Sequence, residues 1–345
     1  YLALCTANLP TPSIVDGSEH FNTVLYSGTG ATQSITGVGF QPDFVWAKRR
    51  SATGDHILSD SVRTAGKYLS SNLTAAEITS TDFDSFDSDG FTVNAVDQTG
   101  GLNASGSTYA SWNWKAGGTA VSNTNGSITS QVSANTDAGF SIVSYTGDEV
   151  DGATVGHGLS QKPDLIIIKN RTDAVNWVVM TDVIDGSEDA LYLNTTGAKG
   201  EASQDVPTSS VFTVDNWGLI NGSGDAHIAY CFANSDIIKA GSYTGNGSTD
   251  GPFVYTGFRP AWVMVKQSSG GSTGWLIYDT ARDTFNEADA VLQAHVTAAE
   301  VTAADIDILS NGWKFRTNDS AVNGSGATYI YLAFAETPQK HSNAR

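Results

Sequence analysis

The amino-acid sequence predicts an all-β protein made of three tandem antiparallel β-sandwich repeats, jelly-roll-like and each about 100 residues long. Three observations predict this fold: the chain repeats itself, apolar residues alternate with a period of two, and turn residues separate short segments. A chain of 345 residues is long enough for several cores. Glycine is abundant, but apolar residues make up 40% of the sequence, so a disordered or collagen-like chain is excluded.

The internal repeat is marked by landmarks that recur in the same order. Each copy opens with Tyr-Ser-Gly or Tyr-Thr-Gly, continues through a proline-containing turn and an apolar run ending in lysine, and closes with a glycine-serine turn before an aromatic strand. Because a catalytic site rarely occurs three times in one chain, we expect the shared residues to encode the fold and expect no enzyme activity. The opening tyrosines are Tyr26, Tyr145 and Tyr243.

The strand signals are clearest at the end of each copy. In the first copy Ala110, Trp112 and Trp114 alternate with polar or smaller residues, which predicts a half-buried strand. The apolar runs near the start of each copy are apolar on both faces, and their length favours a central sandwich strand over a helix. These runs are 44–48, 165–169 and 262–266.

Helix is expected at only two places. Thr74-Ala75-Ala76-Glu77 and Thr297-Ala298-Ala299-Glu300 fit the capping box of a helix N-terminus, so the sequence predicts one short helical turn at each.

Domain boundaries follow the changes in composition. The opening residues read as the middle of a longer chain, so we expect a fragment whose N-terminal part is missing. The second and third repeats are joined almost without a linker, which predicts a stiff junction. The predicted segments are a lead-in at 1–20, sandwich repeats at 21–116, 139–238 and 239–340, a Gly/Ser/Thr linker or hairpin at 117–138, and a tail at 341–345.

The net charge of the chain limits the classes of partner that it is expected to bind. A net charge of −18 repels phosphate backbones, so no nucleic-acid partner is expected, and it does not attract an anionic membrane surface. No apolar stretch approaches the length of a membrane span, so membrane insertion is not expected. With only Cys5 and Cys231, a disulfide framework is excluded and two reduced thiols are expected.

Two recurring polar positions are expected to be structural. Asp60, Asp182 and Asp279 follow the apolar run at a nearly constant step, and we expect them to cap turns through their side chains rather than to bind a metal or a sugar. The lysines that end the apolar runs are expected at a sheet edge or rim, with their ammonium groups in solvent. They are Lys48, Lys169 and Lys266.

The acidic segment 82–90 is read as a solvated hairpin turn, with bound calcium as the alternative. Its carboxylates do not follow the spacing of an EF-hand loop. The histidines are scattered, and no Gly-x-Ser-x-Gly elbow occurs. No catalytic residue, metal ligand or cofactor is therefore predicted.

Departures from the repeat are where function can be added. The loop after the recurring aspartate lengthens from 61–66 to 183–189 to 280–289. The longest loop carries an arginine, an aromatic ring and polar groups at an expected sandwich end, where binding loops commonly lie. Its candidate ligand-contact residues are Arg282, Phe285, Asn286 and Glu287.

Several motifs of the repeats are specific in sequence. They are Tyr26-Ser27-Gly28-Thr29-Gly30, Gly39-Phe40-Gln41-Pro42-Asp43, Trp112-Asn113-Trp114-Lys115-Ala116, Asn221-Gly222-Ser223-Gly224 and Val254-Tyr255-Thr256-Gly257-Phe258. With these motifs the chain resembles, over nearly its whole length, a repeated β-rich domain of unknown function. That domain is found in large tail-fibre and virion proteins of marine tailed phages, often after a SPRY or concanavalin-like domain.

The resemblance implies a non-enzymatic structural protein of a phage virion, a tail-fibre or adhesin component that contacts the host surface. Its expected partners are other virion proteins and host surface glycans, and its expected location is the virion, extracellular once assembled. A homotrimer is one expectation, and a pseudo-threefold unit formed by one chain is the other. The alternatives are a capsid-bound fibre or decoration protein, a secreted bacterial lectin-like module and, third, a depolymerase.

Overall fold

The structure, a computed structural model, describes residues 11–95 and 101–338. These residues form antiparallel sheets with a few short helical turns, so the all-β prediction is confirmed. Cys5, the first half of the expected lead-in and the expected tail at 341–345 lie outside the described residues.

The first unit of the chain, η2 to β9, contains two layers of strands. One sheet has the order β1-β9-β3-β4, and a second sheet, β2-β8-β7, covers one of its faces. The core between them includes Val45, Ala47 and Phe91. The elements are η2 (Gly17–Glu19), β1 (Phe21–Ser27), β2 (Gln33–Thr36), β3 (Phe44–Arg49), β4 (His56–Asp60), β5 (Lys67–Tyr68), β6 (Ile78–Thr79), β7 (Phe83–Asp87), β8 (Gly90–Val93) and β9 (Thr108–Trp114).

The second unit, β10 to β19, repeats this strand order as β12-β19-β14-β15 and extends it at both edges. Strands β10 and β11 come from the segment read as a linker or hairpin; they pair with each other, and β11 also pairs with β12. The sheet of β13 and β18 covers the unit's own core. The elements are β10 (Val121–Asn123), β11 (Ser130–Asn135), β12 (Phe140–Thr146), β13 (Thr154–Gly156), β14 (Leu165–Asn170), β15 (Val178–Thr181), β16 (Asp189–Tyr192), β17 (Gly200–Glu201), β18 (Val211–Thr213), α1 (Gly218–Asn221) and β19 (Ala226–Phe232).

The third unit, β20 to β27, again has the order β20-β27-β22-β23. Its sheet continues through β24, β25, β26 and β21, so the second layer is an extension of the first sheet and not a separate sheet. The elements are β20 (Ile238–Thr244), β21 (Phe253–Tyr255), β22 (Phe258–Gln267), β23 (Trp275–Asp279), β24 (Ala288–Gln293), β25 (Val301–Leu309), β26 (Gly312–Phe315), α2 (Ser320–Asn323) and β27 (Thr328–Pro338).

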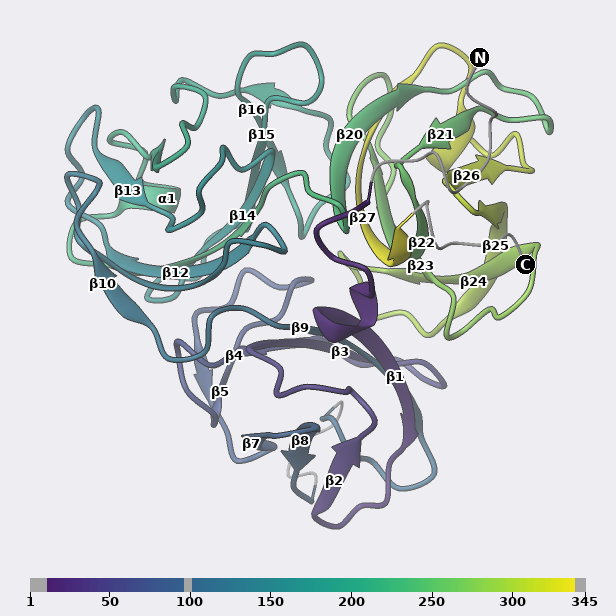
Figure 1. The fold of residues 1–345 in the computed structure, drawn as a ribbon, viewed down its shortest axis with the longest axis horizontal. Helices are drawn as coiled ribbons and strands as arrows, with labels where there is room; N and C mark the ends of the chain where they lie inside the picture. The colour runs from purple at the N-terminus through teal and green to yellow at the C-terminus, as the bar shows by residue number, and fades with distance from the viewer. Residues whose placement is uncertain (1–10, 96–100, 339–345) are drawn as a thin grey trace.

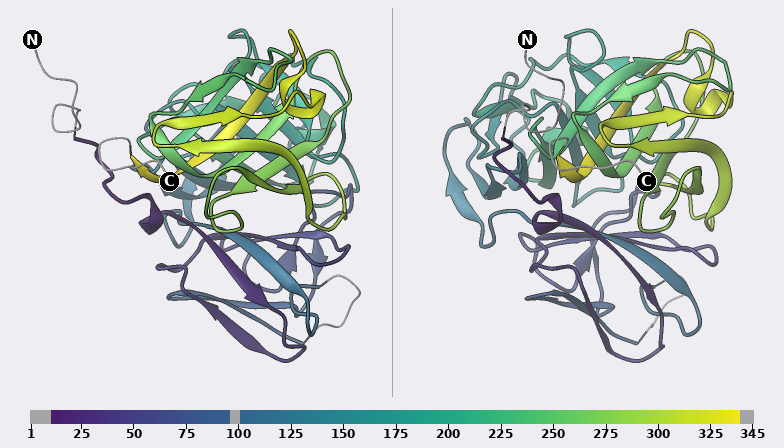
Figure 2. Two further views of the ribbon diagram at one scale, coloured as in Figure 1. Left: turned by 90° about the vertical axis from the view of Figure 1, so that its right-hand side faces the viewer. Right: turned by 45° about the vertical axis from the view of Figure 1, so that its right-hand side comes forward.

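The three units surround a common centre (Figure 1), and the side views show the first unit against the other two (Figure 2). Along β3, Val45 and Ala47 point into the unit's own core, while Phe44 and Trp46 belong to a core shared by all three units. This explains why the central run is apolar on both faces. Because one face of each main sheet is buried only by the other units, an isolated unit would expose that face to water.

Aromatic rings fill the shared core and link the units in pairs. Phe44 of the first unit stacks on Tyr230 of the second, with ring centroids 4.2 Å apart. Phe21 stacks in the same way on Phe334 of the third unit at 4.9 Å. Phe334 also meets Phe232 of the second unit edge-on, at 5.7 Å.

The opening tyrosine and the closing asparagine of each unit connect the start of the unit to its end through hydrogen bonds to the backbone, and we call each such pair a staple. In the second unit the Tyr145 hydroxyl donates to the carbonyl of Ile220 at 2.6 Å, and the Asn221 side chain accepts from the backbone N–H of Asp148 at 2.9 Å. Gly147 is required there because a Cβ would clash with the Gly222 carbonyl oxygen. The equivalent tyrosine bonds are Tyr26 to Leu102 and Tyr243 to Val322, and the equivalent asparagine bonds are Asn103 to Thr29 and Asn323 to Asn246.

The two predicted helical turns are wrong. Residues 74–77 and 297–300 are not helical. The backbone N–H of Glu77 donates to the carbonyl of Arg171 in the second unit, and that of Glu300 donates to the carbonyl of Arg50 in the first, both at 2.9 Å. Hydrogen bonds between units therefore replaced the local capping pattern.

Candidate functional site

Two of the three recurring aspartates lie in buried ion pairs at the contacts between units. The Asp60 carboxylate accepts from the backbone N–H of Arg63 at 2.8 Å, as a turn cap should, and from its guanidinium at 2.5 Å. Both side chains are fully buried. Tyr230 of the second unit donates its hydroxyl to the same carboxylate at 2.8 Å.

A second carboxylate extends this contact between the first and second units. Glu77 accepts two hydrogen bonds from the Arg171 guanidinium, at 2.8 and 3.0 Å. Burial opposes ionisation of Glu77, but the hydrogen bond to Arg171 and the charges of Arg63 and Arg171 outweigh it, so its pKa is lowered.

The contact between the third and first units is built in the same way. Arg282 pairs with Asp279 at 2.5 Å and with Glu300 at 3.1 Å. Glu300 in turn accepts two bonds from the guanidinium of Arg50 in the first unit. The Trp112 indole takes the place of the tyrosine and donates to Asp279 at 2.9 Å.

The second and third units meet differently. In the first and third units, Asp60 and Asp279 pair with the first residue of the central apolar strand. In the second unit Thr181 holds this position, and Asp182 follows it. Asp182 pairs instead with Lys162, so its expected role as a turn cap is wrong. Lys199 donates its backbone N–H to the carbonyl of Ser268. Lys199 and Ser268 therefore stand at the positions that a glutamate and an arginine hold in the other two contacts.

The expectation that the three lysines reach solvent is also wrong. Lys48, Lys169 and Lys266 are fully buried. Lys48 donates to the carbonyl of Thr297 in the third unit at 3.3 Å, and Lys266 to the carbonyl of Thr196 in the second at 3.2 Å. Burial lowers the pKa of each lysine to about 8. For Lys48 and Lys266, the end of the central strand would be a rim in an isolated unit, but here it meets a neighbouring unit. Lys169 donates instead to carbonyls of its own unit, those of Asn170 and Asp173.

The candidate contact loop of the third unit is divided between the interior and the surface. Arg282 is fully buried in its two ion pairs, so it is not presented to a ligand. Asn286 donates to and accepts from the backbone of Ile308, both at 2.9 Å. Phe285 is 76% exposed, and Glu287 is exposed. Asn286 is nevertheless exposed, so a ligand at this loop would meet Phe285, Asn286 and Glu287.

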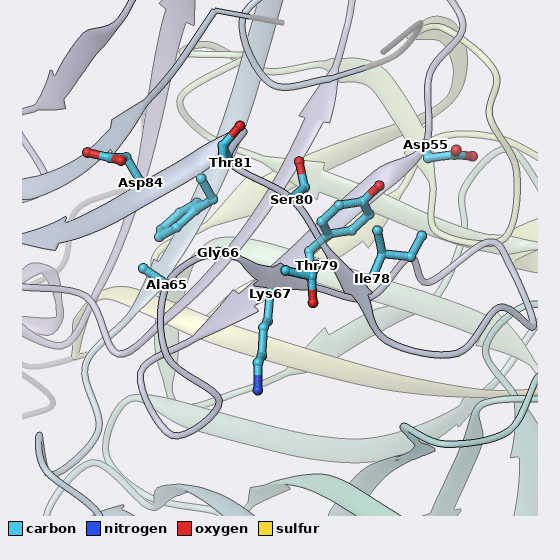
Figure 3. Close-up of a pocket in the computed structure, with 11 residues that line it drawn as sticks. Asp55, Ala65, Gly66, Lys67, Ile78, Thr79, Ser80, Thr81 and Asp84 are labelled. Atoms are coloured by element: carbon cyan, nitrogen blue, oxygen red, sulfur yellow. The ribbon is translucent and has the colours of Figure 1, made fainter. Parts of the chain in front are cut away.

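A groove of about 820 Å³ lies in the first unit beside the hairpin of β5 and β6 (Figure 3). Its polar lining includes Asp55, Lys67, Ser80, Thr81 and Asp84. In the close-up, Asp84 and Asp55 lie at opposite ends, with Thr81 and Ser80 between them. The groove is therefore rich in hydrogen-bond acceptors and hydroxyl groups.

The groove also has apolar walls. Tyr68 lines it and packs, half-buried, against the core of the first unit, and Phe83 of that core lies behind the lining. Burial, with Asp82 and Asp55 adding to it, raises the pKa of Tyr68, which keeps the phenol neutral. Asp55 accepts from Asn72 at 2.7 Å, which orients this carboxylate at the groove.

The groove results from a local change in sheet pairing. In the second and third units, β16–β17 and β24–β25 continue the main sheet, whereas β5 and β6 form a separate two-stranded sheet. This sheet touches β4 through the isolated bridge between Leu58 and Leu69. The candidate contact residues lie in the longest loop after the recurring aspartate, whereas the groove lies in the unit with the shortest one. The two-residue strands that form it leave no periodic signal.

Other candidate features are accounted for by the fold. Segment 82–90 forms the hairpin of β7 and β8, as predicted, and the carboxylate of Asp89 accepts from the backbone N–H of Gly37 and Gly39. Among the described residues, no group of three or more His, Cys, Asp or Glu side chains is arranged to hold a metal ion. None of the described helices is long and apolar enough to cross a membrane.

The sheets, the shared core and the staples define an all-β protein whose antiparallel units share one centre. The chain belongs to the family described as a domain of unknown function, DUF7483, which it matches over residues 16–338. No curated protein and no solved structure matches the chain.

Proposed function

We propose that this chain is a non-catalytic structural component of a phage virion, a tail-fibre or adhesin-type protein that contacts the host surface. The observation that carries the proposal is that the repeated polar residues make their hydrogen bonds within the protein and not at an open site. The tyrosine and asparagine staples, the buried lysines and the carboxylates at the contacts between units all bond within the protein.

The arrangement also suits a load-bearing surface protein. One face of each main sheet is buried against the other units, which favours cooperative unfolding and leaves few segments for a protease to reach. Loops, outer sheet faces and the groove remain outside this core and are available for contacts. The resemblance of the repeats to phage virion proteins supplies the setting, and the partners we propose are other virion proteins and host glycans.

We also propose that a single chain forms a pseudo-threefold unit, which the arrangement of the three units around a common centre supports. Homotrimer formation stays a prediction, which light scattering of the purified chain would measure.

Immunogold electron microscopy of particles of a phage that encodes this chain tests the proposal. Antibody raised against the folded chain is used, and antibody preadsorbed with the chain is the control. Gold at the tail tip or fibres supports the adhesin function, and gold over the head supports a capsid fibre or decoration protein. Bare particles would overturn the virion location and favour the secreted lectin-like module.

A further inference from the structure

We propose that the groove of the first unit binds an uncharged oligosaccharide, which lies along the groove against Tyr68 and hydrogen-bonds to its hydroxyl and carboxylate groups. This proposal rests on the proposed function, because it names the ligand class of an adhesin.

The dimensions of the groove fit a ligand of several sugar rings. Its volume of about 820 Å³ lies within the range of known small-molecule sites. Asp84 and Asp55 lie at its opposite ends, so polar contacts are spread along its length and do not converge on one point. A chain of linked rings matches such a spread better than a single compact molecule.

The lining has the two kinds of group that a sugar ring needs. A sugar presents an apolar ring face and a rim of hydroxyl groups. Tyr68, which is half-buried, supplies apolar ring surface and a polar tip, and the buried Phe83 lies beneath the groove as part of the core. Ser80 and Thr81 can each donate and accept a hydrogen bond, and the carboxylate of Asp84 accepts only. Asn94 donates to Asp84 at 3.1 Å and thereby orients the carboxylate.

The charges of the groove argue against an anionic ligand. Asp55 and Asp84 line it, and Asp82 lies close enough to Tyr68 to affect its pKa. Lys67 is the cation of the lining, and its ammonium lies 3.7 Å from the Glu77 carboxylate. With a net charge of −18 on the whole chain, uronic or sialic acid residues would be repelled.

A basic peptide is the other ligand that acidic groups attract, but the lining fits it less well. Lysine side chains would pair with the two carboxylates and leave the hydroxyl groups of Ser80 and Thr81 without matched partners. Sugar hydroxyl groups can satisfy both, because each of them donates and accepts.

The test is binding of the whole purified chain to an array of neutral and anionic bacterial polysaccharides, followed by calorimetry with neutral hexasaccharides and with penta-lysine. We expect binding to neutral members only, with affinity nearly unchanged between 0.05 and 1 M salt, because screening weakens charge pairs and not neutral contacts. Tyr68→Ala is expected to weaken binding by about tenfold, which is about 1.4 kcal/mol.

Tyr68 packs against a core, so a second variant is needed in case Tyr68→Ala does not fold. Thr81 is exposed, and Thr81→Trp should fill the groove and abolish binding without loss of thermal stability. Phe253→Ala, at another exposed aromatic of the third unit in β21, is the matched control and should bind as the parent does. Phe285→Ala tests the candidate contact loop of the third unit separately.

Three results would overturn the proposal: no binding to any neutral glycan, neutral binding that Thr81→Trp leaves intact, or salt-sensitive binding of penta-lysine alone. If Phe285→Ala removes the binding instead, the ligand lies at the loop of the third unit. A chain that labels the virion but binds no neutral glycan would reject this site and leave the proposed function standing.

Discussion

The carboxylate of Asp279 in the third unit accepts a hydrogen bond from the indole of Trp112 in the first, 2.9 Å away. Asp60 has the same relationship with the Tyr230 hydroxyl across the contact between the first and second units. In both places an arginine three residues later neutralises the aspartate inside the protein. The contact between the second and third units lacks this arrangement, since Thr181 stands at the aspartate position.

Removing one partner of such a buried pair should be costly. Arg63→Met leaves the Asp60 carboxylate buried without its cation, so the free energy of unfolding should fall by about 3–5 kcal/mol. Urea unfolding followed by tryptophan fluorescence measures it. Lys162→Met is the control, because Lys162 is 34% exposed and its pair with Asp182 should contribute at most about 1 kcal/mol. Equal losses of unfolding free energy in Arg63→Met and Lys162→Met would contradict the larger contribution assigned to the buried pair.

The contact between the first and second units should weaken in acid. The folded-state pKa of Glu77 lies below its usual value of 4.5, so its stabilising contribution is present above that pH and is lost as the pH falls through the folded-state pKa. The stability gap between the parent and Glu77→Gln should therefore be largest near neutral pH and shrink below pH 4.5. In an Arg171→Met background the gap should be smaller but should persist, because Arg63 still lies beside Glu77. If the stability difference between the parent and Glu77→Gln grows in acid, the lowered pKa of Glu77 is not the source of the pH dependence.

The glycine of the opening motif should tolerate no side chain. Gly147→Ala places a methyl group against the Gly222 carbonyl oxygen and should destabilise the protein by about 1–3 kcal/mol. Gly218→Ala is the matched control, because open space surrounds that position at the start of α1. Alanine there should be neutral or stabilising by up to about 1 kcal/mol. Thermal unfolding of both variants compares them directly.

The three buried lysines should resist chemical labelling. A lysine with a pKa of about 8 would react faster than an ordinary lysine if it were accessible, because more of it is unprotonated at neutral pH. Since Lys48, Lys169 and Lys266 are fully buried, an amine-reactive ester should leave them unmodified in the folded chain. Lys115, which is exposed, should be modified and serves as the internal control. Mass spectrometry after digestion reads out each site, and fast labelling of Lys48 would contradict its burial.

Local patterns predicted the elements that depend on nearby residues. The alternation in 109–114 predicted the strand β9, and the acidic run at 82–90 predicted the hairpin of β7 and β8. The expected half-burial of β9 is wrong, because both of its faces are buried. Local sequence patterns gave wrong predictions where contacts with another unit determine the backbone conformation. The capping box at 74–77 does not form a helix because the backbone of Glu77 pairs with Arg171, 94 positions later in the chain.

The sequence by itself determined the fold class and the recurring landmarks, because strand periodicity, turn residues and the opening and closing motifs act over short distances. The closure of three units around one core was decided by tertiary structure. Lys48 and Lys266 have the same local sequence whether they face water or a neighbouring unit, and in the folded chain each donates to a carbonyl of the neighbouring unit and is buried. The groove likewise exists because β5 and β6 leave the main sheet, a choice of strand pairing that no local pattern encodes.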